Sequence, residues 1–337
     1  MKMFQALPAY FGGKRRLLGL IFKDLPSPSE APTFCDPLMG GGSVSLYAKA
    51  RGHRVICNDV AERSHIVGKA LIANNQTQLT YDDLVKLSMP TEETGYAERT
   101  LAPEVFPAAH AHYLDLFLAN AGSLQGNKRW LAHLLIIKHA LQMRPMGNFG
   151  ARKIMLQAAA GDWDEMKPAF AKDLIHRGLP CHPIRLAEKL LPKINAGVFS
   201  NGQSNEAHKG DVLEFLSGVD GDICYMDPPY AGTQSYERAM KPLDELLNGG
   251  PLKVTPNPYS SEPPEVTLPK LFEAAAHIPI LVLSYGNKAI DLTGLMDLMR
   301  KHRPNVTGEA IQYQHCTGLA SAESKKNNQE LLVIGRN

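Results

Sequence analysis

The sequence lacks the cysteine pattern of a disulfide scaffold or a zinc site. Its five cysteines are odd in number and widely scattered, with no Cys-x-x-Cys pair. Disulfide frameworks and cysteine zinc sites need paired or closely spaced thiols, so both classes are excluded. The twelve histidines are scattered as well, and we expect no metal site. A reducing cytoplasm fits this usage.

Long apolar runs are also missing. The N-terminal segment MKMFQALPAYFGGKRR has no apolar core of the kind found in signal peptides. The most apolar stretches, residues 131–143 and 278–284, are too short or too interrupted to span a bilayer. We therefore expect a soluble cytoplasmic protein with no membrane partner.

Neither sign of charge is in excess. The 337 residues include 36 Lys and Arg against 34 Asp and Glu, a formal net charge of +2. A polycationic surface is thereby excluded, and any binding of nucleic acid needs a local basic patch. The length is sufficient for one large domain or two modest ones.

The first third of the chain has the pattern of a β-α-β unit. Residues 32–36 and 54–58 are β-prone, and a glycine run and an apolar periodic stretch over 44–50 separate them. The order strand, tight turn, helix, strand is typical of a doubly wound α/β sheet.

The strand pattern stops and later resumes. It returns at residues 222–226, 278–284 and 330–334, whereas the middle of the chain has helical spacing without strand alternation. We predict one α/β domain built from residues 1–75 and 195–337, with a mostly helical insertion over 76–194. Within the α/β domain, the proline- and glycine-rich residues 231–266 are predicted to form a long loop.

A glycine-rich turn follows the first predicted strand. Its sequence runs from Asp36 to Gly42, and glycines let a backbone turn sharply and approach a ligand closely. A dinucleotide fingerprint would have a further glycine where Ser45 stands. Asp59 ends the next strand, where an acidic side chain can bind ribose hydroxyls. The pattern favours an adenosine cofactor without a pyrophosphate, such as S-adenosylmethionine; the alternative is a structural turn with a capping Asp.

A second motif, Asp227-Pro228-Pro229-Tyr230, follows the predicted strand 223–226. Strand ends of this kind hold ligands in α/β folds. The two prolines remove backbone donors, so the carbonyl oxygens of this segment only accept hydrogen bonds. A carboxylate, a carbonyl and an aromatic face together suit a planar amine. The alternative is a rigid surface turn.

A third segment, from Tyr10 to Arg16, contains two glycines and a lysine. Together the three motifs resemble those of the Dam-like DNA adenine methyltransferases of the alpha class. This family transfers a methyl group from S-adenosylmethionine to the N6 amine of adenine. The resemblance covers nearly the whole chain in the family's order, with a loosely matched middle. It is carried by Tyr10, Gly12-Gly13-Lys14, Asp36-Pro37 with Gly40 to Gly42, Asn58-Asp59, Gly210-Asp211, Asp227 to Tyr230 and Glu330-Leu-Leu.

The resemblance implies a Rossmann-like fold that binds S-adenosylmethionine, and it assigns roles to residues. It implies that Asp227, Pro228, Pro229 and Tyr230 hold an adenine flipped out of duplex DNA. It also implies a set of cofactor-binding residues: Tyr10, Gly12, Gly13, Lys14, Asp36, Gly40, Gly42, Asp59 and Asp211. From the sequence alone Asp211 is better explained as a helix cap. Leu38 stands where the family usually has Phe.

The expected partner is double-stranded DNA, together with a cognate restriction endonuclease in restriction-modification systems of bacterial or phage type. We expect the insertion to read the DNA, because its basic residues are dense and Arg and Asn pair with guanine and adenine in the major groove. The candidates are Lys128, Arg129, Arg144, Asn148, Arg152 and Lys153. The same residues also fit a solvated face and a packed loop.

Two other functions remain open from the sequence. A carboxylate or amide followed by Pro-Pro-Tyr serves any planar amine or amide, so RNA or protein glutamine is an alternative substrate. A catalytically degenerate DNA-binding protein is the second alternative. The segment from Tyr10 to Lys14 and the basic insertion favour DNA methylation.

Overall fold

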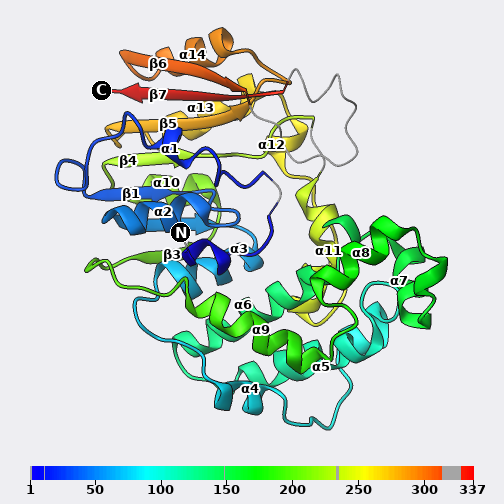
Figure 1. The fold of residues 1–337 in the computed structure, drawn as a ribbon. Helices are drawn as coiled ribbons and strands as arrows, with labels where there is room; N and C mark the ends of the chain where they lie inside the picture. The colour runs from blue at the N-terminus through cyan, green and yellow to red at the C-terminus, as the bar shows by residue number, and fades with distance from the viewer. Residues whose placement is uncertain (1, 11, 148, 233–234, 313–327) are drawn as a thin grey trace. The chain divides into compact units, whose positions relative to one another are not determined.

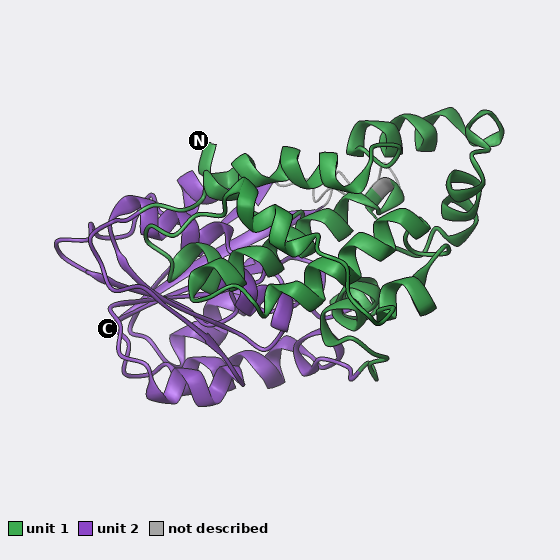
Figure 2. Ribbon diagram, turned by 90° about the horizontal axis from the view of Figure 1, so that it is seen from below, with its two compact units in different colours: residues 1–9, 69–199, 236–254 green, residues 10–68, 200–235, 255–337 purple. Residues whose placement is uncertain are grey.

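The computed structural model describes residues 2–10, 12–147, 149–232, 235–312 and 328–337. The chain divides into two compact units, which Figure 2 shows in different colours. Unit 1 consists of residues 1–9, 69–199 and 236–254, and unit 2 of residues 10–68, 200–235 and 255–337. No helix of the described residues is long and apolar enough to cross a bilayer.

Unit 2 is built on a mixed sheet of seven strands, which confirms the predicted α/β class (Figure 1). The strand order is β3-β2-β1-β4-β5-β7-β6, and only β7 runs antiparallel to its neighbours β5 and β6. The strands are β1 (Thr33–Asp36), β2 (Arg54–Asp59), β3 (Glu206–Lys209), β4 (Ile223–Met226), β5 (Ile280–Gly286), β6 (Asn305–Gln312) and β7 (Gln329–Arg336). The helices are α1 (Leu18–Ile21), α2 (Ser43–Arg51), α3 (Glu62–Val67), α10 (Val212–Gly218), α12 (Pro258–Ser261), α13 (Pro264–Ala274) and α14 (Leu292–Arg300).

The central strands are buried on both faces. Every residue of β4 is buried, as expected for a parallel strand covered on either side. On one face Phe34 and Tyr225 stack, and Phe22 packs on Phe34. On the other face Met226 and Phe272 belong to a single apolar cluster that also includes side chains of α10 and α14. These two layers fix the strand ends from which the candidate site is built.

The connectivity reverses between β1 and β4. The chain proceeds outward from β1 to β2 and β3, and then returns to place β4 on the opposite side of β1, with Phe34 paired to Ile223. In open α/β sheets, ligands bind at the carboxyl ends of the strands where the order reverses. The segments after Asp36 and after Met226 therefore leave the sheet at the position expected of a binding site.

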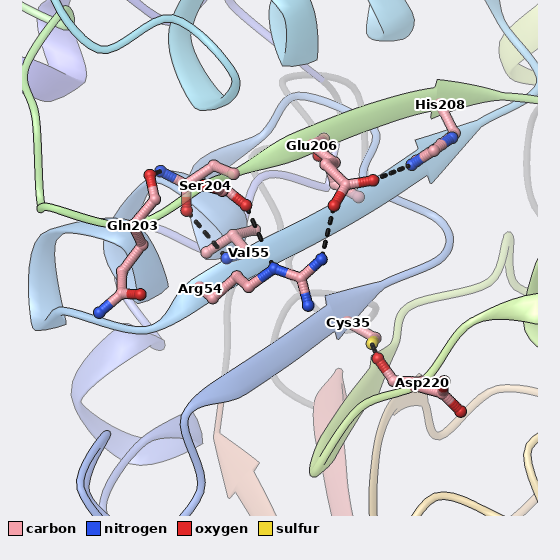
Figure 3. Close-up of polar contacts among 10 residues, drawn as sticks. Cys35, Arg54, Val55, Gln203, Ser204, Glu206, His208 and Asp220 are labelled. Carbon is pink, nitrogen blue, oxygen red and sulfur yellow. Dashed lines mark hydrogen bonds and ion pairs between the residues drawn. The ribbon is translucent and has the colours of Figure 1, made fainter.

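A polar contact joins the edge strand β3 to β2 (Figure 3). The guanidinium of Arg54 lies 2.6 Å from the carboxylate of Glu206 and also donates to the Ser204 carbonyl. His208 lies 3.2 Å from the other oxygen of Glu206. Both partners of this ion pair are exposed, so we expect it to contribute at most about 1 kcal/mol and to act mainly on strand register.

The described residues of unit 1 form helices and the loops between them, with no strand. Its long helices α5 (Ala108–Ala121) and α6 (Asn127–Gln142) bury apolar faces that include Leu114 and Leu135. Residues 76–194 are mostly helical, as predicted. The elements are η1 (Lys2–Gln5), η2 (Gly68–Ile72, which begins in unit 2), α4 (Tyr81–Leu87), η3 (Ala97–Leu101), α5 (Ala108–Ala121), α6 (Asn127–Gln142), η4 (Pro145–Gly147), α7 (Arg152–Ala160), η5 (Trp163–Glu165), α8 (Pro168–Arg177), α9 (Pro183–Asn195) and α11 (Tyr236–Asn248).

The prediction of a long loop over 231–266 is wrong for residues 236–248, which form helix α11. Met240, Leu243 and Leu246 recur at helical spacing and are buried, and this apolar face outweighs the single internal proline, Pro242. The short α12 follows in the same segment. Unit 1 therefore also takes in residues 236–254, as well as residues 1–9.

Candidate active site

The candidate site lies at the carboxyl end of β4, where Asp227 begins the Pro-Pro-Tyr segment. The Lys14 ammonium lies 2.9 Å from Oδ1 and 2.8 Å from Oδ2 of Asp227, and it also donates to the carbonyl of Gly12. Lys14 is buried, so this ion pair is formed largely away from water. The sequence assigned Lys14 to the cofactor, and the structure brings it to Asp227.

A second carboxylate, Glu330 of β7, completes the cluster. Its Oε1 accepts a hydrogen bond of 2.7 Å from the Tyr230 hydroxyl and lies 3.4 Å from the Lys14 ammonium. The Tyr230 hydroxyl also lies 3.1 Å from Asp227 Oδ1. We call Lys14, Asp227, Tyr230 and Glu330 the DPPY cluster.

Burial sets the protonation of the DPPY cluster. Burial raises the pKa of Asp227, the Lys14 ammonium opposes that rise, and the Glu330 carboxylate adds to it. Burial and the two carboxylates hold the pKa of Tyr230 well above its usual value. The hydroxyl of Tyr230 therefore stays protonated near neutral pH and acts as a donor.

The ring of Tyr230 is held on several sides. It packs against Tyr285 with the centroids 4.9 Å apart, and the Tyr285 hydroxyl accepts a hydrogen bond from the Ala231 amide. A Cβ on Gly286 would lie only 2.7 Å from the Tyr230 ring, so the strand end needs glycine at this position. Lys14 lies 5.2 Å from the ring centroid.

The glycine turn after β1 is packed against Tyr10. Gly40 and Gly42 both have positive φ, at 54° and 75°, which favours glycine. A Cβ on Gly41 would lie 2.7 Å from the Tyr10 Cβ, so the aromatic residue covers the turn directly. The family resemblance assigns Tyr10 and these glycines to the same ligand, the cofactor, and in the structure they are in contact.

Asp59 fixes the glycine turn from the end of β2. Its carboxylate accepts hydrogen bonds from the amides of Gly40, at 2.8 Å, and Ala61, at 2.9 Å. Burial raises the pKa of Asp59, and these two amides partly offset that effect. The carboxylate thus joins the ends of β1 and β2.

Two buried oxygens beside this turn have no hydrogen-bond partner among the described residues. They are Oδ1 of Asp36 and Oδ1 of Asn58. The other carboxylate oxygen of Asp36 accepts from Ser45 at 2.6 Å, and the Asn58 amide donates to the carbonyls of Pro37 and Gly210. Burial raises the pKa of Asp36 to about 7. A buried acceptor without a donor is costly, and such positions are typical of ligand sites.

Asp211 lies apart from the DPPY cluster's contacts. It is exposed and caps α10, where its Oδ1 accepts from the amides of Leu213 and Glu214. The helix-cap interpretation from the sequence therefore holds. Its charge also acts on Tyr259 of α12, whose pKa burial and this carboxylate raise to about 12. Sequence reasoning missed Tyr259, because nothing in the segment before α13 marked it.

Most of the basic residues proposed for DNA lie on the surface of unit 1. Arg129 and Lys153 are exposed, Lys128 pairs with Asp83, and Arg152 pairs with Glu104. Asn148 lies outside the described residues.

Arg144 differs from the other basic candidates because it is buried. Its guanidinium donates to the Ala9 carbonyl, contacts the Met240 sulfur and lies over the Phe149 ring. These contacts fit the packed-loop interpretation of this residue. Across the described ranges we find no group of three or more His, Cys, Asp or Glu side chains that could hold a metal ion.

Comparisons with known proteins agree with the motifs. Residues 10–118 match the family model of D12 class N6 adenine-specific DNA methyltransferases. The type II methyltransferase M2.HphI of Haemophilus parahaemolyticus is 26% identical over 97% of both chains. The modification methylase LlaI of Lactococcus lactis is 24% identical over 97% of this chain, which spans only 55% of that relative.

Among solved structures, a SAM-dependent methyltransferase from Agrobacterium tumefaciens is similar at 11% identity and a TM-score of 0.34, with 95% of this chain and 59% of that chain covered. The family model and the two curated relatives confirm the resemblance predicted from the motifs. The chain is thus similar to the D12 class of N6 adenine-specific DNA methyltransferases over residues 10–118, and to two bacterial methylases over nearly its whole length.

Proposed function

We propose that this chain is a site-specific methyltransferase that transfers a methyl group from S-adenosylmethionine to the N6 amine of an adenine flipped out of duplex DNA. One observation carries the residue assignment. The DPPY cluster lies at the carboxyl end of β4, and the buried oxygens of Asp36 and Asn58 that have no partner among the described residues lie at the ends of β1 and β2.

The free acceptors fit the donors of this cofactor. S-adenosylmethionine carries an ammonium group and ribose hydroxyls, which are the kinds of donor that Asp36 Oδ1 and Asn58 Oδ1 lack. We assign Asp36, Asp59, Asp211 and the turn from Gly40 to Gly42 to its binding, together with Tyr10 and the Gly12 to Lys14 segment. When bound, the cofactor supplies a methyl group on a sulfonium sulfur.

The DPPY segment would make the adenine amine reactive. The lone pair of N6 is delocalised into the ring, which makes the amine a poor nucleophile. Hydrogen bonds from its two protons to Asp227 and to the Pro228 carbonyl would pull the nitrogen toward a tetrahedral shape. The Asp227 carboxylate would also stabilise the positive charge that develops on the nitrogen in the transition state.

Tyr230 would hold the flipped base. Taking a base out of the duplex costs a few kcal/mol, and stacking on an aromatic ring offsets about 1 to 3 kcal/mol of this cost. Pro229 would keep the tyrosine at a fixed distance from the strand end, because its ring fixes the backbone φ.

Duplex DNA is the proposed macromolecular partner, and we assign its recognition to unit 1. The exposed Arg129 and Lys153 are the first candidates for contacts to DNA, and Lys128 and Arg152 are further candidates. Two relatives are named as a type II methyltransferase and a modification methylase. On that ground we include a cognate restriction endonuclease among the proposed partners, and a DNA-associated, cytoplasmic location.

The reaction is tested by incubating the purified protein with unmethylated genomic DNA and S-adenosylmethionine and mapping methylated adenines by single-molecule sequencing. We expect N6-methyladenine at one sequence motif. No modified adenine at any motif, with an active control enzyme, would rule the proposal out. RNA and protein substrates run in parallel would reveal the alternative specificities.

The role of Asp227 is tested by Asp227→Ala. Loss of the carboxylate removes both the acceptor for N6 and the stabilising charge, so we expect methyl transfer to fall about a hundredfold or more. Cofactor affinity, measured by calorimetry, should remain within a few-fold of wild type. Asp297→Ala, an exposed position on α14, serves as the control. If the variant lost cofactor affinity as severely as activity, Asp227 would belong to the cofactor site instead.

A further inference from the structure

Glu330 is a buried carboxylate with no part in the proposed mechanism. It lies in β7 opposite Gly286 of β5 and is 1% exposed. The five residues that follow it form a buried apolar run, so a charged side chain here needs partners that offset its burial. Its Oε1 contacts Lys14 and Tyr230, which belong to the DPPY cluster.

The charge of the DPPY cluster depends on Glu330. Asp227 and Lys14 alone would form a neutral pair, and the ammonium would cancel much of the carboxylate's field at a nearby amine. With Glu330, two carboxylates share one ammonium, so the cluster has a net charge of −1 when both carboxylates are ionised. A net negative charge is what a nitrogen that becomes positive in the transition state requires.

The hydrogen bonds also distinguish the two carboxylates. The Tyr230 hydroxyl has one proton and lies 2.7 Å from Glu330 but 3.1 Å from Asp227. The shorter contact indicates that the proton is donated to Glu330. Oδ1 of Asp227, which accepts from Lys14 at 2.9 Å, then keeps one lone pair for another donor.

We propose that Glu330 is a positioning residue for methyl transfer, which accepts the hydrogen bond of the Tyr230 hydroxyl and shares the Lys14 ammonium so that Asp227 keeps an acceptor site for the target amine. This inference rests on the proposed function, since Asp227 is there the acceptor for the N6 amine and Glu330 is the group that positions it. Glu330 itself touches neither the base nor the cofactor in this scheme.

The arrangement predicts how Asp227 titrates. The charged or titratable groups that act on Asp227 are Lys14, Glu330 and Tyr230, with Asp36 and Tyr225 as further neighbours. Among these, the Glu330 carboxylate raises the pKa of Asp227. Replacing Glu330 by an uncharged isostere should therefore lower that pKa.

The test compares wild type with Glu330→Gln, Tyr230→Phe and the double variant, and Glu273→Gln, an exposed position on α13, is the charge control. We measure the single-turnover rate of methyl transfer with radiolabelled S-adenosylmethionine, cofactor affinity by calorimetry, and the titration of 13C-labelled aspartate carboxyls by NMR. Asp227→Asn assigns the Asp227 signal.

For Glu330→Gln we expect at least a tenfold slower transfer, cofactor affinity within threefold of wild type, and an Asp227 signal that titrates at lower pH. The same substitution should cost less in the Tyr230→Phe background, because the hydroxyl that Glu330 holds is already absent. Glu273→Gln should match wild type in every measurement.

An unchanged Asp227 titration would overturn the inference, and so would equal costs in both backgrounds. Loss of transfer accompanied by an equal loss of cofactor affinity and of thermal stability would reduce Glu330 to a structural role, which also overturns it. If the wild type methylates no DNA, the proposed function fails, and the titration alone still decides whether Glu330 acts on Asp227.

Discussion

Asp36 works against the stability of the fold at neutral pH. Burial raises its pKa to about 7 from an ordinary value of 3.8, and one of its oxygens has no partner within the described part of the chain. A carboxyl whose pKa is higher in the folded than in the unfolded protein lowers the free energy of unfolding as pH rises between those two values. Residues kept despite such a cost are typical of functional sites.

Asp36→Asn should therefore stabilise the protein without cofactor in a pH-dependent way. The difference in unfolding free energy between variant and wild type should grow by about 2 to 4 kcal/mol between pH 4 and pH 8 and level off above pH 7. Urea denaturation at several pH values measures it. Asp297→Asn, an exposed position, should follow the wild-type curve. A constant difference across this range would show that Asp36 titrates like an ordinary surface carboxyl.

At the scale of elements, the end of β5 controls the position of Tyr230. A Cβ on Gly286 would lie 2.7 Å from the ring, which is closer than side chains approach, so Gly286→Ala should displace it. Because stacking on a base contributes about 1 to 3 kcal/mol, we expect kcat/KM for DNA to fall about 5- to 150-fold while cofactor affinity is retained. Steady-state kinetics and calorimetry measure the two effects.

Gly218 provides the matched control for this substitution. It ends α10 in the same unit, and a Cβ there meets no atom within 4 Å, so Gly218→Ala should behave as wild type. Methylation by Gly286→Ala at the wild-type rate would mean that the ring of Tyr230 either tolerates the shift or does not carry the base.

The elements around the site could be predicted from local patterns, whereas the DPPY cluster could not. The strands before Asp36 and Asp227 were found because β-prone runs end in turn residues, and the glycines mark the turn. Lys14 and Asp227 are 213 residues apart in the chain, and no local pattern pairs them. One feature of the sequence could have indicated Glu330: it is a charged residue at the start of a strand predicted to be buried, and a buried charge requires a partner.

Helix α11 was missed for a related reason. Prolines and glycines around it were taken as marks of a loop, but the burial of Met240, Leu243 and Leu246 depends on packing within unit 1 that the segment's own composition does not reveal. Arg144 is a similar case, since only its contact with the Ala9 carbonyl and Phe149 shows that it is part of the packed interior.

At the scale of the molecule, the net charge of +2 conceals a separation of charges between site and surface. Unit 2 holds the buried carboxyl groups of Asp36, Asp59 and Glu330 and the partly buried one of Asp227, whereas Arg129 and Lys153 are exposed on unit 1. A protein with so small a net charge binds DNA through a limited number of local contacts, each of which releases counterions from the phosphates. DNA affinity should accordingly depend strongly on salt.

We expect Arg129→Ala and Lys153→Ala each to weaken binding of a DNA duplex and to reduce the slope of log affinity against log salt by about one. Fluorescence anisotropy between 50 and 200 mM salt, roughly the range over which phosphate contacts are sensitive, measures the slope. Lys301→Ala, an exposed position in unit 2, is the matched control and should leave the slope unchanged. Arg144→Ala should instead lower the melting temperature, because its guanidinium is buried among protein groups. If the slope were unchanged in both unit 1 variants and reduced in Lys301→Ala, the phosphate contacts would belong to unit 2 instead.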